Sequence, residues 1–86
     1  MADDLLTRIQ KAARYGDIRP SRHAREEMAN AGASAASVKA ALLSATTVIP
    51  QDGGGVRLEG GKDQDGDELT VVVTEQPYGL RIVTVF

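Results

Sequence analysis

His23 is the only histidine in the chain and the side chain best suited to proton transfer. A histidine changes charge near neutral pH, so it can act as a general base or acid without unusual surroundings. Arg22 and Arg25 lie beside it, and Glu27 follows one helical turn later. Arginine binds phosphate oxygens through a planar fork of N–H donors. The pattern points to chemistry on a phosphodiester; a histidine that only makes a hydrogen bond at the start of a helix accounts for the same residues.

Cleavage of RNA by side chains needs a base, cations for the charged phosphorane and an acid for the leaving oxygen. His23 is the candidate proton-transfer residue, and its partner would be Glu27, Lys62 or Tyr78, or would be absent. Lys62 and Arg81 are further candidates for phosphate binding if the sheet faces them. No metal or other cofactor is expected, because one histidine needs further ligands and no nearby carboxylate spacing supplies them.

The composition excludes several other classes of protein. A chain of 86 residues allows one small domain. The absence of cysteine excludes disulfides, thiolate zinc sites and cysteine nucleophiles. Three aromatic residues are too few for an aromatic base-stacking platform to be the main mode of nucleic-acid binding. No apolar run approaches the roughly 20 residues of a membrane span, and no signal-peptide pattern is present, so we expect a cytoplasmic protein without membrane contact.

Charge is divided unevenly along the chain. Residues 1–45 hold seven Lys/Arg and five Asp/Glu, whereas residues 46–86 hold three and seven. This is far from the basic stripe of a strong nucleic-acid binder. If RNA is bound, we expect the first half of the chain to bind it.

The first half of the chain has the apolar spacing of helices. A first helix is expected after an N-cap at Asp3 or Asp4, and Gly16 supplies its stop. A second helix is predicted over residues 22–31, and a third after a cap at Ser34.

From Thr46 onward the period changes to two, which predicts strands. The predicted strands cover residues 46–49, 56–60, 68–74 and 80–86. Short connections favour an antiparallel meander. We therefore expect an α+β fold with two or three N-terminal helices on one face of a four-stranded antiparallel sheet. Within one compact unit, residues 1–19 would form a helical extension and residues 20–86 the main domain.

Three alternating aspartates, Asp63, Asp65 and Asp67, suggest a calcium loop. An EF-hand loop starting at Asp63 needs glycine in sixth place and glutamate in twelfth, but here Gly66 is fourth and Thr74 is twelfth. A hairpin turn rich in Asp and Gly accounts for the same residues.

Residues 21–28, Ser-Arg-His-Ala-Arg-Glu-Glu-Met, and the Gly-Ala-Ser of residues 32–34 resemble a family of small bacterial proteins known as a domain of unknown function. Its pattern is a His-Ala-x-x-Arg-Met helix, an Arg-Gly-Ile-Ser junction, a second helix and a β-meander. The later segments that resemble this meander are residues 56–60, 69–73 and 82–86. The resemblance covers residues 20–86.

Such proteins are similar in layout to RelE-like toxins and to the wider barnase–EndoU–colicin–RelE ribonuclease superfamily. The resemblance implies a ribonuclease-type fold whose active site combines a helical histidine with basic or hydroxyl residues of the sheet. His23 and Thr84 stand at matching positions. The expected site then has proton-transfer and auxiliary polar residues His23, Glu27 and Thr84, and phosphate binders Arg22, Arg25, Lys62 and Arg81.

Three basic positions of the family pattern are lost here, in addition to Ala33, which stands in place of the junction's isoleucine. Glu27 and Ala31 stand where arginines are usual, and Asp67 stands where a basic residue is common. Each change removes positive charge from the region where an RNA backbone would lie. Two hypotheses follow: a toxin-type, metal-independent endoribonuclease of RelE-like fold, and a non-catalytic protein-interaction or regulatory module on the same scaffold.

The expected partners differ between these hypotheses. An endoribonuclease would bind RNA, and either kind of protein could bind a cognate antitoxin or another protein. Because the last predicted strand ends at Phe86, an exposed sheet edge there would also allow a homodimer.

Overall fold

The helices of this protein begin at side-chain caps that the sequence makes visible. The computed structural model describes residues 4–86, so Asp3 and the first residues of the expected extension 1–19 lie outside the described part. Asp4, Ser21 and Ser34 each accept a hydrogen bond from the backbone N–H three residues later. This bond satisfies one of the free N–H groups of a helix start.

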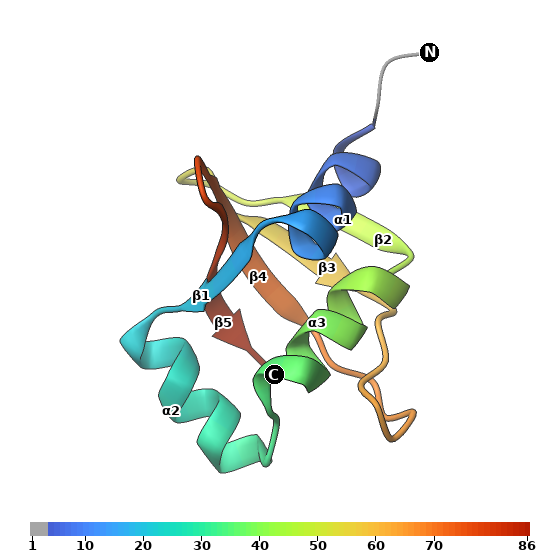
Figure 1. Ribbon diagram of the computed structural model, residues 1–86, viewed down its shortest axis with the longest axis vertical. Helices are drawn as coiled ribbons and strands as arrows, with labels where there is room; N and C mark the ends of the chain where they lie inside the picture. Colours follow the sequence, from blue (N-terminus) through green and yellow to red (C-terminus); the bar gives the residue numbers. More distant parts are fainter. Residues whose placement is uncertain (1–3) are drawn as a thin grey trace.

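Three helices and five strands make up the described chain. In order they are α1 (Leu5–Tyr15), β1 (Asp17–Pro20), α2 (Arg22–Ala31), α3 (Ala35–Ser44), β2 (Thr47–Pro50), β3 (Val56–Glu59), β4 (Val71–Gln76) and β5 (Gly79–Val85). The strands form one sheet in the order β1-β5-β4-β3-β2. Helices α1 and α3 lie over one face of this sheet, and α2 follows the end of β1 beside β5 (Figure 1). The predicted α+β class is confirmed.

The sheet has one strand more than predicted. Strand β1 pairs with β5 in parallel, from Asp17 opposite Gly79 to Pro20 opposite Ile82, and the other strand pairs are antiparallel. The segment before α2 is short and ends in proline, so its sequence has the character of a turn. Proline is tolerated here because β1 is an edge strand and needs no ladder bond on its outer side. Gly79 has φ 143, and a Cβ there would overlap the backbone of Asp17, so a glycine allows β1 to approach.

The strand bounds near the end of the chain also differ from the prediction. Strand β4 extends to Gln76 and β5 begins at Gly79, so the turn between them is only Pro77 and Tyr78. The expected free edge at the last strand is wrong, because β5 lies between β1 and β4. The edges of the sheet are β1 and β2, so an edge-to-edge dimer would have to form there.

The core lies between the helices and the sheet face that they cover, called the inner face here. Its fully buried large side chains are Ile9, Val38, Leu42, Leu58, Val71, Val73, Leu80, Ile82 and Val85. In β5 the exposed Arg81 stands between buried Leu80 and Ile82. Because side chains alternate along a strand, Arg81 lies on the opposite, outer face of the sheet. The outer face carries the polar residues considered below.

Gln10 joins α1 to the end of α3. Its Nε2 donates to the carbonyl oxygens of Leu42, Leu43 and Ala45 at 3.3, 3.2 and 3.1 Å. The last carbonyls of a helix lack donors within the helix, so Gln10 satisfies groups that would otherwise need water. The N-terminal helix is thus tied to the rest of the fold by polar as well as apolar contacts.

The chain after β3 packs against the end of α3. Ser44 Oγ accepts from the backbone N–H of Lys62 at 2.8 Å and contacts its carbonyl oxygen. A Cβ on Gly61 would overlap the carbonyl oxygen of Ala41, so only glycine permits this approach. This contact fixes Lys62 near α3.

The acidic segment forms the predicted turn. Asp63 Oδ1 accepts from the backbone N–H groups of Asp65 and Asp67, both at 2.9 Å. Such bonds are what makes aspartate favourable in turns.

Within residues 4–86, no group of three or more His, Asp or Glu side chains is arranged to hold a metal ion. None of the described helices is long and apolar enough to cross a bilayer.

Candidate functional site

A groove of about 560 Å³ lies on the outer face, where the start of α2 meets β4 and β5. Its lining residues are Ser21, Arg22, His23, Thr74, Gln76, Arg81 and Val83. Three of them, Arg22, His23 and Arg81, belong to the predicted site, and no carboxylate is among them. A smaller hollow of about 250 Å³ between α1, β1 and α3 is lined mainly by alanine and glycine. The groove is therefore the candidate site, because it gathers the chemically active side chains.

The start of α2 is fixed to β5 by the residue that caps the helix. The Ser21 N–H donates to the carbonyl of Ile82 at 2.8 Å, and Ser21 Oγ donates to the carbonyl of Val83 at 3.4 Å. The pairing of β4 with β5 shifts register at this point, which makes Val83 an extra residue in β5. Bulges of this kind bend a strand and redirect side chains. The cap and the bulge together bring His23 to the same groove as Arg81.

Arg81 has the most available positive charge in the groove. It is exposed and pairs with Thr74 across β5 and β4, so both side chains lie on the outer face. Its guanidinium makes no ion pair or hydrogen bond with any residue from 4 to 86. Arg22 makes one long contact, 3.7 Å between its Nε and Glu26 Oε1, and its side chain is 93% exposed. Both arginines are exposed toward an anion in the groove, Arg81 without a partner among residues 4–86 and Arg22 with only this long contact.

Glu27 connects His23 to the backbone of β5. His23 Nε2 lies 3.3 Å from Glu27 Oε1, which makes an ion pair when the imidazole is protonated. The same carboxylate oxygen accepts from the N–H of Val85 at 3.1 Å. Strand β1 ends at Pro20, opposite Ile82, and does not reach Val85. Glu27 therefore supplies the acceptor for the Val85 N–H that a neighbouring strand would otherwise provide. Glu27 does not line the groove, and its geometry is that of a positioning residue for His23.

The other predicted residues lie around the groove without lining it. Arg25 is exposed on α2 but is not among the lining residues. Thr84 pairs with Val72, beyond the bulge from the groove. Lys62 lies before the start of β4, where its backbone forms an isolated antiparallel β-bridge with Glu68. The groove lies at the other end of β4. The structure therefore brings together Arg22, His23 and Arg81, and leaves the other phosphate binders apart.

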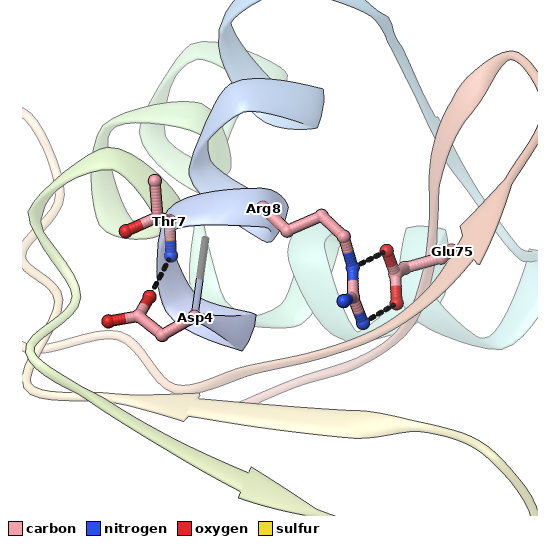
Figure 2. A network of polar contacts seen from close by, with 4 residues as sticks. All are labelled: Asp4, Thr7, Arg8 and Glu75. Carbon is pink, nitrogen blue, oxygen red and sulfur yellow. Dashed lines mark hydrogen bonds and ion pairs between the residues drawn. The ribbon is translucent and has the colours of Figure 1, made fainter. Parts of the chain in front are cut away.

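The one acidic residue at this end of β4 is turned to the inner face. Glu75 accepts two hydrogen bonds from Arg8 of α1, at 2.7 Å from Nε and 2.9 Å from Nη2 (Figure 2). This paired guanidinium lowers the pKa of Glu75 below its ordinary value. Figure 2 also shows the Asp4 cap, where the N–H of Thr7 lowers the pKa of the Asp4 carboxyl. The ion pair with Arg8 keeps a negative charge on the side away from the groove.

Sequence reasoning missed four lining residues. The sequence around Ser21 is typical of a helix cap and of nothing more, and Thr74, Gln76 and Val83 belong to no distinguishing motif. The alternation of β4 would have placed Thr74 and Gln76 on one face, but which face met α2 depended on the unpredicted strand β1.

A comparison with family models accounts for most of the chain. The domain of unknown function DUF4258 matches residues 21–86. The chain belongs to this family. No curated protein and no solved structure gives a significant match. The DUF4258 match begins at the cap of α2 and includes every residue of the groove, while α1 and β1 precede it. The similarity of DUF4258 proteins to RelE-like toxins stays a prediction.

Proposed function

We propose that this DUF4258 protein binds a phosphate group of RNA in the groove and cleaves the RNA there as an endoribonuclease. The observation that carries the proposal is that Arg22, His23 and Arg81 line one groove and that the two guanidinium groups are available. Arginine pairs and a helix start both favour a phosphate. A histidine beside them is positioned to move a proton at the bound group.

In the proposed reaction, His23 removes the proton from a ribose 2′-hydroxyl. The 2′-oxygen then forms a bond to the adjacent phosphorus, and the bond from phosphorus to the 5′-oxygen breaks. The leaving 5′-oxygen takes a proton from water, and the protonated His23, the one imidazole of the chain, then gives its proton to the hydroxide left behind. The products are a 2′,3′-cyclic phosphate and a free 5′-hydroxyl. Arg22 and Arg81 would stabilise the extra negative charge of the phosphorane.

The cleavage test uses purified protein, a labelled single-stranded RNA and analysis of the new ends. A proton-transfer residue contributes roughly 10²–10⁴-fold to rate, so His23→Ala should slow cleavage by that factor. Arg81→Ala should slow it by roughly 10²-fold through lost stabilisation of charge. The proposal requires a 2′,3′-cyclic phosphate end and activity that persists in a chelator. Equal cleavage by the His23→Ala variant would assign the activity to a contaminant and refute the proposal.

A binding test separates phosphate contacts from chemistry. With an RNA whose 2′-hydroxyls are methylated, the 2′-oxygen cannot attack, and affinity is measured against salt concentration. Each phosphate contact to a single strand contributes about −0.7 to the slope of log K against log salt. Arg81→Ala should therefore make the slope shallower by about 0.7. Arg25→Ala is the matched control, because Arg25 is exposed on the same helix but does not line the groove, and its slope should not change.

A non-catalytic interaction module is the second candidate. It is favoured by the lining of the groove, which holds His23 as its one side chain able to exchange protons near neutral pH. This candidate predicts that the methylated and unmethylated RNAs remain intact alike, and that a protein with an acidic surface competes for Arg22 and Arg81. Cleavage that depends on His23 would exclude it.

A further inference from the structure

Arg19 stands beside the groove on the unpredicted strand β1. It is directly opposite Arg81 in the parallel pairing of β1 with β5. Its neighbours Ile18 and Pro20 are half-buried and pair with the buried Leu80 and Ile82, so Arg19 itself lies on the outer face. Neighbouring strands are roughly 4.8 Å apart. Arg19 and Arg81 are therefore adjacent cations on one surface, although Arg19 precedes the residues that the family model matches.

The guanidinium of Arg19 contacts an aromatic ring and a carboxylate. Its Cζ lies 4.1 Å from the centre of the Tyr78 ring, so the cation lies over the aromatic face in a cation–π contact. Its Nη2 donates to Asp17 Oδ2 at 3.0 Å. The side chain nonetheless remains 60% exposed. Tyr78 and Asp17 thus hold the guanidinium while more than half of the side chain stays exposed to solvent. We call Asp17, Arg19 and Tyr78 the Arg19 shelf.

The two adjacent arginines differ in what they can bind. Arg81 has no partner among the described side chains and suits a phosphate oxygen. Arg19 already shares its charge with Asp17, so it is less suited to an anion and better suited to a planar group. Nucleobases splayed out of a single strand stack on guanidinium planes as they do on aromatic rings. A base in a duplex is already stacked and paired, so it is not available for such a contact.

We propose that the Arg19 shelf stacks one unpaired nucleobase next to the phosphate bound at Arg81. The inference rests on the proposed function, and it specifies the substrate as single-stranded RNA rather than duplex. A purine has more surface to stack than a pyrimidine, so the shelf prefers a purine at this position. The preference comes from stacking, and it involves no hydrogen-bond reading of the base edge.

The test measures binding of an uncleavable RNA pentanucleotide with methylated 2′-hydroxyls and a purine at every position. A series of five probes carries one abasic nucleotide at each position in turn. For the unaltered protein, one abasic position should weaken binding by about tenfold, within the range of single stacking contacts, and the remaining positions should matter less. The Arg19→Lys variant keeps the charge but loses the plane. It should bind the complete probe about tenfold more weakly and show no abasic penalty at any position.

Arg81→Lys is the matched control on the neighbouring strand, and it should retain the abasic penalty. A penalty that persists undiminished in Arg19→Lys, or is equal at all positions, would overturn the shelf. The cleavage by His23 and the salt slope of Arg81 would be unaffected by that outcome, so the proposed function would stand. Absence of binding by the unaltered protein would overturn both. Because Arg19 is exposed, we expect the variants and the unaltered protein to have equal melting temperatures. Equal melting temperatures would show that differences in binding do not arise from unfolding.

Discussion

Glu27 offers a test of what holds the candidate site to the sheet. Its carboxylate accepts the N–H of Val85, a residue that is only 2% exposed. Replacing Glu27 with alanine removes this acceptor and leaves the N–H of a buried strand without a partner. The substitution also removes the contact with His23. The loss should appear first in the stability of the fold, independently of any reaction.

The size of the effect follows from the burial of the donor. Leaving a buried donor unsatisfied costs about 1–3 kcal/mol. The Glu27 side chain is 25% exposed, so water can reach part of the vacated space and offset some of this cost. We expect Glu27→Ala to lower the free energy of unfolding by about 1–2 kcal/mol. In a domain of this size that corresponds to a melting temperature lower by about 5–15 °C.

The assay is urea unfolding followed by circular dichroism, with thermal melting as a second measurement. Glu27→Gln keeps a carbonyl oxygen for the Val85 N–H and should stay within about 0.5 kcal/mol of the unaltered protein. Glu26→Ala is the matched control, because Glu26 is 64% exposed and has only the long contact with Arg22. It should also change stability by less than about 0.5 kcal/mol.

Two results would refute this reasoning. If Glu27→Ala were as stable as the Glu26→Ala control, the bond to Val85 would contribute nothing. If Glu27→Gln were as unstable as Glu27→Ala, the negative charge of Glu27 would matter and the hydrogen bond to the strand would not explain its role.

Three further predictions concern the scaffold. Arg8 lowers the pKa of Glu75, so their ion pair contributes stability above the ordinary pKa of glutamate, and this stability is lost as pH falls through the lowered pKa. Melting temperatures of the unaltered protein and of Glu75→Gln should therefore differ at pH 7 and converge in acid. A difference that stays constant with pH would contradict the contribution of this ion pair. Gln10→Glu should destabilise more than Gln10→Ala in urea, because a carboxylate faces three carbonyl oxygens; the reverse order would reject this capping role. Gly61→Ala should lower the free energy of unfolding by about 1–3 kcal/mol or more, because its Cβ would overlap a carbonyl oxygen of α3. Gly55→Ala, whose Cβ would meet only ordinary van der Waals contacts, should lower it clearly less in the same urea assay. Equal losses in the two variants would contradict the close packing of Gly61 on α3.

The helices were predictable from the sequence because their signals are local. Ser21 and Ser34 cap helices within three residues of themselves, and Gly32 ends α2 in the left-handed conformation, φ 68, that favours glycine. Such bonds depend on neighbours in the chain and hardly at all on the rest of the fold. Asp4 follows the same rule at the start of α1.

Strand β1 could not be predicted because its hydrogen bonds are made with β5 at the far end of the sequence. Four residues ending in proline carry no clear period, and they become a strand only when β5 is present to pair with them. The site depended on this missing element. Arg22 and His23 could be grouped from their adjacency, whereas their meeting with Arg81 follows from the position of α2 after β1. No sequence pattern singles out Arg19, because its position beside Tyr78 and Arg81 follows from the pairing of β1 with β5.

The parallel pairing of β1 with β5 also determines when the groove can exist during synthesis. Ser21 and Val83 are 62 positions apart, yet the bond between them fixes the start of α2 on the sheet. A growing chain that already contains α2 has no Arg81 and no β5 on which to dock. Contacts of such long sequence separation form late, after the loop between them is closed. A partly made chain would therefore lack the proposed activity, and the messenger that encodes it would meet the folded groove only after β5 has left the ribosome.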